Sequence, residues 1–473
     1  MGPRERKVLW GVGIGLLLLL LTGCTSLFTY NSDELVTPPV SPSTSGQYVV
    51  VLEDWDVPEA ALAEIRAAGG EVIRALPQIG VVFVRAEDPE FPARAAGLAG
   101  VEEVGPDRLW ELPPLEPVPV AVISPEQHGV QSNSFYVAYQ WDIKRVGGIP
   151  DTWDVETGDG VTVAVLDTGV DYFHQDIAPN YAYGVSYIDP ATLPPGYTLL
   201  EPGDELDYIG HGTHVAGSIA APIEYGAIIG VAPGAKIANY KVLAYVQDPE
   251  GDTGGIGFDS WILPAILDAA DDGCQVINMS LGGSYDMSNP EDLAGFLAYC
   301  RATQYAWQKG TLVVAAAGND GEDRSQGPVR HAPSATPSAL SVSATGPFDE
   351  LASYSNYGAH TVDFAGPGGD EAPPDQQYDD PATPWPDWIE DWLCFSALYF
   401  DGTNHWYAWM AGTSMAAPKV SGVAALIYAH FPGITPHQVV EALKASADDI
   451  GAPGYDFLYG WGLVNAYRAI VGP

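Results

Sequence analysis

Two histidines stand three positions apart in the segment GHGTHVAGSIA, residues 210–220. If these small residues form a helix, His211 and His214 lie on one face of it. Two kinds of chemistry fit this spacing: a shared metal ion, or a proton-transferring imidazole beside a histidine that only packs. A zinc pair needs a third ligand and preferably a general-base glutamate between the histidines. Gly212 and Thr213 stand there instead, so the sequence favours the second interpretation, with His214 as the packing residue.

An aspartate, an asparagine and a serine stand at the ends of other apolar segments. Asp167 ends VTVAVLD, Asn319 follows TLVVAAAG, and Ser414 begins the apolar helical segment GTSMAAPKVSGVAALIYAH. With His211 they form a set that acyl transfer uses: a hydroxyl nucleophile, a base, a carboxylate that orients the base, and an amide donor for the oxyanion. The N-terminal end of the serine helix adds a positive dipole end near the developing charge.

These side chains need a fold that brings the ends of elements together. The segments VTVAVLD, KIANYKVL, CQVINMSL and TLVVAAAGN are short and continuously apolar, as are parallel strands covered on both faces. The segments DSWILPAILDAADDG and EDLAGFLAYCRATQYAWQKG have helical spacing and end in glycine. We therefore expect a doubly wound α/β domain with a mostly parallel sheet over residues 140–473, and ligands beyond the carboxyl ends of its strands.

A smaller unit is predicted ahead of this domain. Residues 47–112 read as strand, helix, strand, strand, helix and strand, the split βαβ order of a small α+β domain. The Pro-rich residues 113–139 follow as a linker. The Ser-, Thr- and Pro-rich residues 24–46 precede the unit and are expected to be a flexible tether.

Five motifs resemble those of the subtilisin-like serine peptidases and stand in the same chain order: VAVLDTGVD, GHGTHVAGSIA, INMSLGG, AAAGND and GTSMAAPKVSGVAAL. The resemblance implies a serine endopeptidase in which Asp167 orients the base His211. Ser414 is then the nucleophile, and Asn319 stabilises the oxyanion. The alternative is a catalytically silent binding protein with the same fold, which the complete Asp-His-Asn-Ser set disfavours.

The same resemblance extends to the smaller unit. It implies that residues 47–112 are a pro-segment, a cis-acting inhibitor of a zymogen that processes itself. Maturation is then expected within residues 113–139, and the peptidase domain over residues 140–473.

By resemblance, two edge segments pair with an extended protein or peptide substrate. His331 is expected near the floor of the specificity pocket, where it would favour an acidic or polar side chain. The implied substrate-binding residues are Gly255, Gly257, Ser280, Leu281, Gly282, Ala316 and Gly318.

Catalysis of this kind needs no cofactor, and structural calcium is the one metal that the resemblance raises. Asp176 stands where relatives place a calcium ligand, and Glu224 where they place a second side-chain oxygen. The loop around Glu224 departs from the usual Asn-rich pattern, and calcium needs six to eight oxygens. Both outcomes therefore stay open.

The N-terminus resembles a bacterial lipoprotein signal. Residues 1–23 have a basic start and an apolar run from Val8 to Leu21. This run is shorter than a helix that spans a bilayer, which needs about 20 residues. The ending LTGC resembles the lipoprotein processing box, which predicts acylation of Cys24. We expect an extracytoplasmic protein anchored to a membrane by lipid, with secretion as the alternative.

The amino-acid composition limits the classes of partner that the protein can bind. The chain has 61 acidic and 19 basic residues, a formal net charge of −42, which argues against nucleic acid as a partner. A surface that repels copies of itself favours a monomer.

The remaining cysteines, Cys274, Cys300 and Cys394, allow at most one disulfide. Cys300–Cys394 is one candidate pairing.

One insert, over about residues 368–409, departs from the family pattern. It is acidic, rich in Trp and Tyr, and longer than the usual connection before the serine. Two interpretations stay open: a segment that overhangs the active site and selects substrates or a partner, or a surface excursion with its own small core.

Overall fold

The structure is a computed structural model of the 473-residue chain. It describes residues 46–112, 118–120, 138–147, 151–223, 226–371 and 388–472. The expected signal, Cys24, Glu224 and most of the tether and linker lie outside these ranges. Within the described ranges, no helix combines the length and the apolar character needed to cross a membrane.

Residues 47–106 fold as the predicted split βαβ unit. The elements are β1 (Gln47–Leu52), α2 (Glu59–Ala67), β2 (Glu71–Leu76), β3 (Val81–Arg85), α3 (Phe91–Ala96) and β4 (Val101–Pro106). The strands form an antiparallel sheet in the order β2-β3-β1-β4, with a small apolar core around Val50, Ile65 and Phe91. The short strand β5 (Leu109–Leu112) follows and belongs to another sheet. We call residues 47–112 the N-terminal unit.

The predicted doubly wound α/β sheet is confirmed. Seven strands lie in the order β18-β17-β15-β13-β7-β10-β8, and every neighbouring pair is parallel. Because β7 lies between β10 and β13, the strand order reverses beside it, the usual place for a ligand crevice. The strands are β7 (Thr162–Asp167), β8 (Tyr181–Ser186), β10 (Lys236–Lys241), β13 (Val276–Met279), β15 (Leu312–Ala316), β17 (Ala339–Thr345) and β18 (Phe364–Pro367).

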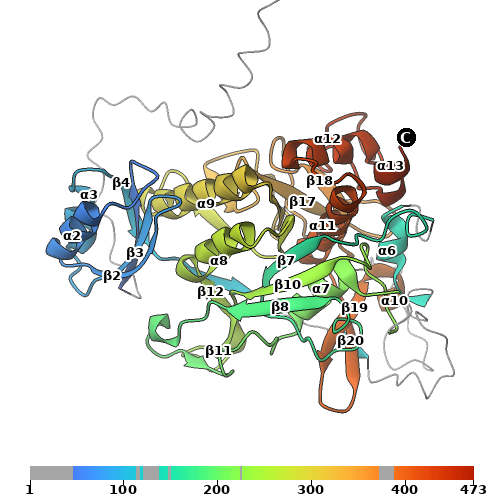
Figure 1. The fold of residues 1–473 in the computed structure, drawn as a ribbon, viewed down its shortest axis with the longest axis horizontal. Coiled ribbons are helices and arrows are strands. Elements are labelled where there is room, and N and C mark those ends of the chain that lie inside the picture. The colour runs from blue at the N-terminus through green and yellow to red at the C-terminus, as the bar shows by residue number, and fades with distance from the viewer. Residues whose placement is uncertain are drawn as a thin grey trace, which may run out of the picture. The chain divides into compact units, whose positions relative to one another are not determined.

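Two pairs of helices cover this sheet (Figure 1). Helix α7 (His211–Ala220) packs against α11 (Thr413–His430), and α8 (Asp259–Asp271) packs against α9 (Pro290–Lys309). The C-terminal helices α12 (Pro436–Ser446) and α13 (Ala466–Val471) pack on α11. Pairing α7 with α11 brings the helix that carries His211 beside the helix that carries Ser414.

Smaller sheets flank the crevice. Strands β9 (Thr198–Leu199), β11 (Ala244–Gln247) and β12 (Thr253–Phe258) form a sheet in which β5 is the strand beside β12. Strand β14 (Gly283–Asp286) pairs with β16 (Val329–Ala332). A 3-10 turn covers Pro190–Thr192.

The described part of the insert joins the main core. It consists of α10 (Trp388–Trp392) and the hairpin of β19 (Cys394–Phe400) and β20 (His405–Met410), with β6 (Val118–Val120) paired to β20. Phe395 and Trp409 of the hairpin are buried in the same apolar cluster as α11. For the described residues of the insert, the interpretation as a surface excursion with its own small core is therefore wrong.

The cysteines within the described ranges are buried, and the candidate disulfide is not formed. Cys274 and Cys394 are free thiols, so Cys300 and Cys394 are not joined.

A buried ion pair ties the start of the α/β domain to helix α11. Asp142 lies on α6 (Trp141–Arg145), and its carboxylate is 2.6 Å from Lys419 Nζ on α11, with both side chains fully buried. Buried charges of this kind are tolerated because each neutralises the other.

We expect Lys419→Met to destabilise the protein by about 3–5 kcal/mol, because it leaves the Asp142 carboxylate buried without its partner. The double variant Asp142→Leu/Lys419→Met should recover most of that loss, since no buried charge remains. Urea unfolding of the full chain in a Ser414→Ala background measures both. Equal destabilisation in the single and double variants would contradict this account.

Candidate active site

Asp167 and His211 meet at the switch point of the sheet. Asp167 is the last residue of β7 and His211 the first of α7, and His211 Nδ1 lies 2.7 Å from Asp167 Oδ1 with both side chains buried. Asp167 Oδ1 also accepts a hydrogen bond from Thr168 N at 2.7 Å. Gly212 permits this approach, because a Cβ there would lie 2.1 Å from the carbonyl oxygen of Gly169.

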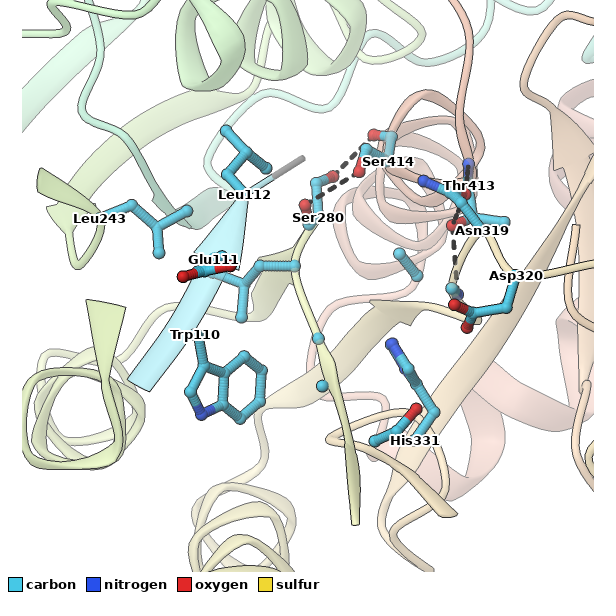
Figure 2. Close-up of a pocket in the computed structure, with 16 residues that line it drawn as sticks. Trp110, Glu111, Leu112, Leu243, Ser280, Asn319, Asp320, His331, Thr413 and Ser414 are labelled. Carbon is cyan, nitrogen blue, oxygen red and sulfur yellow. Dashed lines mark hydrogen bonds between the residues drawn. The ribbon is translucent and has the colours of Figure 1, made fainter. Parts of the chain in front are cut away.

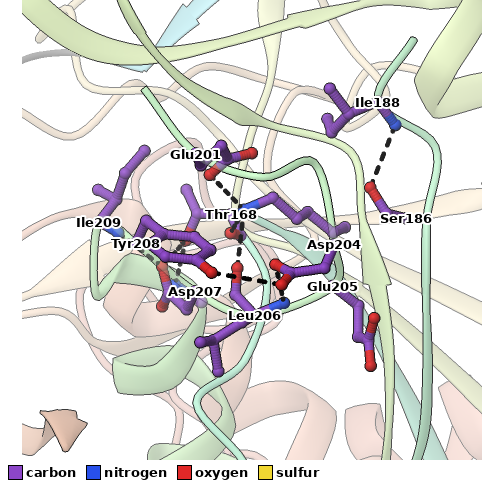
Figure 3. Close-up of polar contacts among 12 residues, drawn as sticks. Thr168, Ser186, Ile188, Glu201, Asp204, Glu205, Leu206, Asp207, Tyr208 and Ile209 are labelled. Carbon is purple, nitrogen blue, oxygen red and sulfur yellow. Dashed lines mark hydrogen bonds and ion pairs between the residues drawn. The ribbon is translucent and has the colours of Figure 1, made fainter. Parts of the chain in front are cut away.

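Asp207 holds the start of α7 in place, and the sequence analysis did not identify it (Figure 3). Its Oδ2 accepts hydrogen bonds from Thr213 N and Thr213 Oγ1 at 2.9 and 2.7 Å. Its Oδ1 accepts from Gly210 N at 2.8 Å and from Thr168 Oγ1 at 2.9 Å. Thr168 Oγ1 in turn accepts from Gly212 N, so one carboxylate links the end of β7 to the first turn of α7. The N-cap position itself is held by Gly210, which has no side chain, and Asp207 supplies the capping contact from three residues earlier.

The same network sets the charge around His211. Burial lowers the pKa of His211, while the charge and hydrogen bond of Asp167 and the charge of Asp207 raise it, and the result lies above the ordinary value. A histidine with a raised pKa and a buried carboxylate partner is suited to accept a proton in catalysis.

His214 faces away from this network. It is buried, and its Nε2 lies 3.2 Å from the carbonyl oxygens of Cys394 and Ala408 in the hairpin β19–β20. Burial lowers the pKa of His214 to about 3, so the ring is neutral and donates to these carbonyls. The structure therefore gives the two histidines different partners.

Ser414 is the second residue of α11, and it hydrogen-bonds with Ser280. Ser414 Oγ donates to the Ser280 carbonyl at 3.0 Å, and Ser280 Oγ donates to the Ser414 carbonyl at 2.7 Å. Among the described contacts, no hydrogen bond joins Ser414 and His211.

Asn319 is oriented by Thr413. Asn319 Oδ1 accepts from Thr413 N at 2.9 Å and from Thr413 Oγ1 at 2.7 Å. With its oxygen engaged in this way, the amide group of Asn319 has its N–H donors left for the cavity that Asn319 and Ser414 both line (Figure 2).

That cavity has a volume of about 300 Å³. Of the predicted substrate-binding residues, it is lined by Ser280, Leu281, Gly282, Ala316 and Gly318. Gly255 and Gly257 do not line it; they lie on β12 at the adjoining sheet edge. We call this space the active-site cavity.

His331 is one of the residues that line the cavity. A Cβ on Gly282 would lie 2.0 Å from His331 Cε1, and one on Gly318 would lie 2.9 Å from His331 Nε2, so the ring packs against both backbones. Its Nδ1 is 3.2 Å from Ser334 Oγ, and burial lowers the pKa of His331 to about 4. The ring is therefore neutral at physiological pH.

The N-terminal unit reaches this cavity through β5. Strand β5 pairs antiparallel with β12, with Leu112 opposite Gly255 and Trp110 opposite Gly257. Trp110, Glu111 and Leu112 line the active-site cavity together with Ser414 (Figure 2). The two predicted glycines thus pair with an extended strand, and that strand comes from this chain.

The predicted calcium ligand Asp176 is buried and partly satisfied by protein donors. Its Oδ2 accepts from Tyr407 Oη at 2.5 Å and from Ala227 N at 3.3 Å. Burial raises the pKa of Asp176 to about 6. Glu224 lies outside the described residues, and within these no group of three or more His, Cys, Asp or Glu side chains could hold a metal. The calcium site stays a prediction.

The chain is similar to known serine proteinases in sequence and in fold. The Subtilase family model matches residues 158–462. A thermophilic serine proteinase of Bacillus sp. (strain AK1) is 33% identical over 341 residues, 72% of this chain and 69% of that protein. Thermitase of Thermoactinomyces vulgaris is 33% identical over 322 residues, 68% of this chain and 92% of that protein. The crystal structure of the epidermin leader peptide processing serine protease from Staphylococcus aureus is similar with a TM-score of 0.69 and 25% identity, over 90% of this chain and 97% of that chain.

We expect Asp207→Asn to lower the pKa of His211, because the substitution removes a nearby negative charge that favours the protonated ring. NMR titration of the His211 ring in Ser414→Ala protein measures this directly. Asp204→Asn is the matched control, since it removes the same charge from an exposed position of the same loop. An equal fall in the pKa of His211 in both variants would show that the buried charge of Asp207 is not the specific cause.

Proposed function

The chain belongs to the subtilase family and is a serine endopeptidase, and we propose that Asp167, His211 and Ser414 are its catalytic triad. The buried hydrogen bond between Asp167 and His211, on a helix that packs against the helix of Ser414, carries the proposal. Its substrates are proteins or peptides.

The proposed reaction begins with the Ser414 hydroxyl. Rotation of this hydroxyl away from the Ser280 carbonyl lets His211 take its proton as the oxygen attacks the substrate carbonyl. Asp167 holds the ring through Nδ1 and stabilises its cation, so Nε2 is the nitrogen that receives the proton. His211 then returns that proton to the leaving amine, and water repeats the sequence to release the acyl group.

Asn319 is the proposed oxyanion donor. Thr413 fixes its oxygen, so its N–H group is held in place before the negative charge develops on the substrate. The N-terminal end of α11 is a second source of positive potential at the same position.

We also propose that the N-terminal unit is a pro-segment that inhibits the active site before maturation in residues 113–139. Its strand β5 lies in the position that an extended substrate would take beside β12. Arg301 of α9 supports the contact, since it donates to the Ile79 carbonyl at 3.0 Å and pairs with Glu102. Gln47 Nε2 donates to the Thr192 carbonyl at 2.8 Å on the other side of the unit.

Two further parts of the proposal concern the membrane anchor and the substrate preference. We propose that Cys24 is acylated and anchors an extracytoplasmic monomer to a membrane, on the strength of the apolar run and the LTGC ending. We propose that the neutral His331 ring favours a polar or acidic substrate side chain, since it lies in the cavity wall between Gly282 and Gly318.

We expect Asn319→Ala to lower kcat by about 10²- to 10³-fold with little change in KM, the range known for an oxyanion-hole asparagine in a related protease.

Ser414→Ala should abolish both turnover and labelling by a fluorophosphonate, and its chain should stay unprocessed. Steady-state kinetics on a peptide ester and mass spectrometry of the labelled protein measure these effects. A Ser414→Ala protein that still turned over substrate would refute the proposed nucleophile.

We expect release of the cleaved N-terminal unit to become faster as the pH rises. Burial and the charge of Asp259 raise the pKa of Asp107, whose side chain is buried where the unit contacts α8. A carboxyl whose pKa is higher in the docked state stabilises that state only while it is protonated. This stabilisation is complete below the ordinary carboxyl pKa, about 4, and is lost as the pH rises through the raised value.

The delay before full activity should therefore be longer at about pH 5 than at about pH 8. Asp107→Asn should weaken this pH dependence, since an amide oxygen still accepts from Ser260 N but does not ionise. Progress curves after dilution of the processed complex measure the delay. An unchanged pH dependence in the Asn variant would contradict the assignment to Asp107.

A further inference from the structure

Trp110 is the large side chain that β5 places against the peptidase domain. It lies opposite Gly257 of β12, two residues before Leu112, and is 5% exposed. Its ring packs on Tyr299 with centroids 5.2 Å apart and on Tyr285 at 6.2 Å. Gly283 lies on another side of the ring, where a Cβ would make ordinary van der Waals contact with the indole at 3.5 Å.

The indole nitrogen meets a buried carboxylate. Trp110 Nε1 donates to Asp259 Oδ1 at 2.8 Å, and Asp259 is fully buried at the start of α8. The hydroxyls of Tyr285 and Tyr299 donate to the same oxygen, each at 3.0 Å. Asp259 Oδ1 is thus an acceptor for three donors, of which the N-terminal unit supplies one and the peptidase domain two.

Departure of the N-terminal unit would remove one of these donors. An apolar side chain in the same place would cover the carboxylate oxygen and leave it short of a hydrogen bond, which is costly in a buried site. A site built to accept a hydrogen bond therefore discriminates against a side chain that has the right shape and lacks the donor.

We propose that Asp259 is a specificity-determining residue: the pocket that Trp110 fills selects substrates with an N–H donor on a flat or long side chain, tryptophan or arginine, over phenylalanine or leucine. The inference rests on the proposed function, because it requires substrate to pair with β12 as β5 does.

The surroundings of the pocket also accommodate a guanidinium group. Arg108 lies with its guanidinium carbon 4.6 Å from the centroid of the Tyr285 ring, and its Nη1 is 3.2 Å from Asp292 Oδ2. A cation over a tyrosine face is stabilised by the ring quadrupole. An arginine in the substrate can therefore stack on the tyrosine rings and donate to Asp259 as the indole does.

Matched peptides and variants of Asp259 test this proposal. Full-length protein is allowed to mature and is given two peptides that share one sequence, patterned on Leu109–Leu112, and differ only by tryptophan or phenylalanine at the Trp110 position. We expect kcat/KM to be about 10- to 100-fold higher for the tryptophan peptide, the range for a hydrogen bond to a charged group. A randomised peptide library should show tryptophan and arginine enriched at one fixed distance from the cleaved bond.

In Asp259→Leu the ratio for the peptide pair should fall to about one or reverse, because the acceptor is lost. Asp259→Asn keeps an acceptor oxygen and loses the charge, so this variant should keep the preference for tryptophan and lose the preference for arginine. If the Leu variant does not mature, the Asn variant provides the test. Asp271→Asn is the control, since it removes an acid from the far end of the same helix and should keep the wild-type preference.

Equal cleavage of both peptides by the wild type, or an unchanged ratio in Asp259→Leu, would overturn the proposal. Labelling of Ser414 by a fluorophosphonate in the wild type separates this result from failure of the proposed function. Matured wild-type protein that is not labelled would contradict the catalytic triad instead.

Discussion

A buried aspartate and a buried histidine must meet at 2.7 Å although they are 44 positions apart in the chain. An ionised carboxylate in this position is costly unless hydrogen bonds compensate for the lost water. Asp167 Oδ1 therefore accepts from His211 and from Thr168 N, and the start of α7 has to lie against the end of β7. Gly212 allows the two backbones to approach, and Asp207 fixes the first turn from the other side. Much of the local sequence around the switch point serves this one contact.

Those parts of the site that lie at the ends of long, regular segments could be predicted from the sequence. Asp167 and Asn319 follow continuously apolar strands, and Ser414 opens a long apolar helix, so the fold type determines where these residues lie. The strands and helices of the N-terminal unit could be predicted equally well, since clear turn residues separate them. Local periodicity is sufficient in each case because the signal and the element span the same residues.

Features that depend on distant pairing could not be read in this way. Strand β5 has four residues and acquires its place only by pairing with β12, and Trp110 and Asp259 are separated by 149 positions. No local pattern indicates that the indole and the carboxylate meet. The direction of the Ser414 hydroxyl, toward the Ser280 carbonyl, also depends on two packed segments and not on either one. Asp207 lies three residues ahead of the N-cap Gly210, so the usual capping position does not point to it either.

The contact between the N-terminal unit and the peptidase domain combines attraction with an electrostatic cost. Arg301 and the β5–β12 pairing favour docking, while burial and the charge of Asp259 raise the pKa of Asp107 and so the cost of ionising it in the docked state. In the function that we propose, the N-terminal unit takes the position of the substrate and supplies one of the donors that Asp259 accepts. Inhibitor and substrate would then be subject to one chemical requirement at Asp259, and the side chain that the unit supplies there would indicate what the pocket accepts.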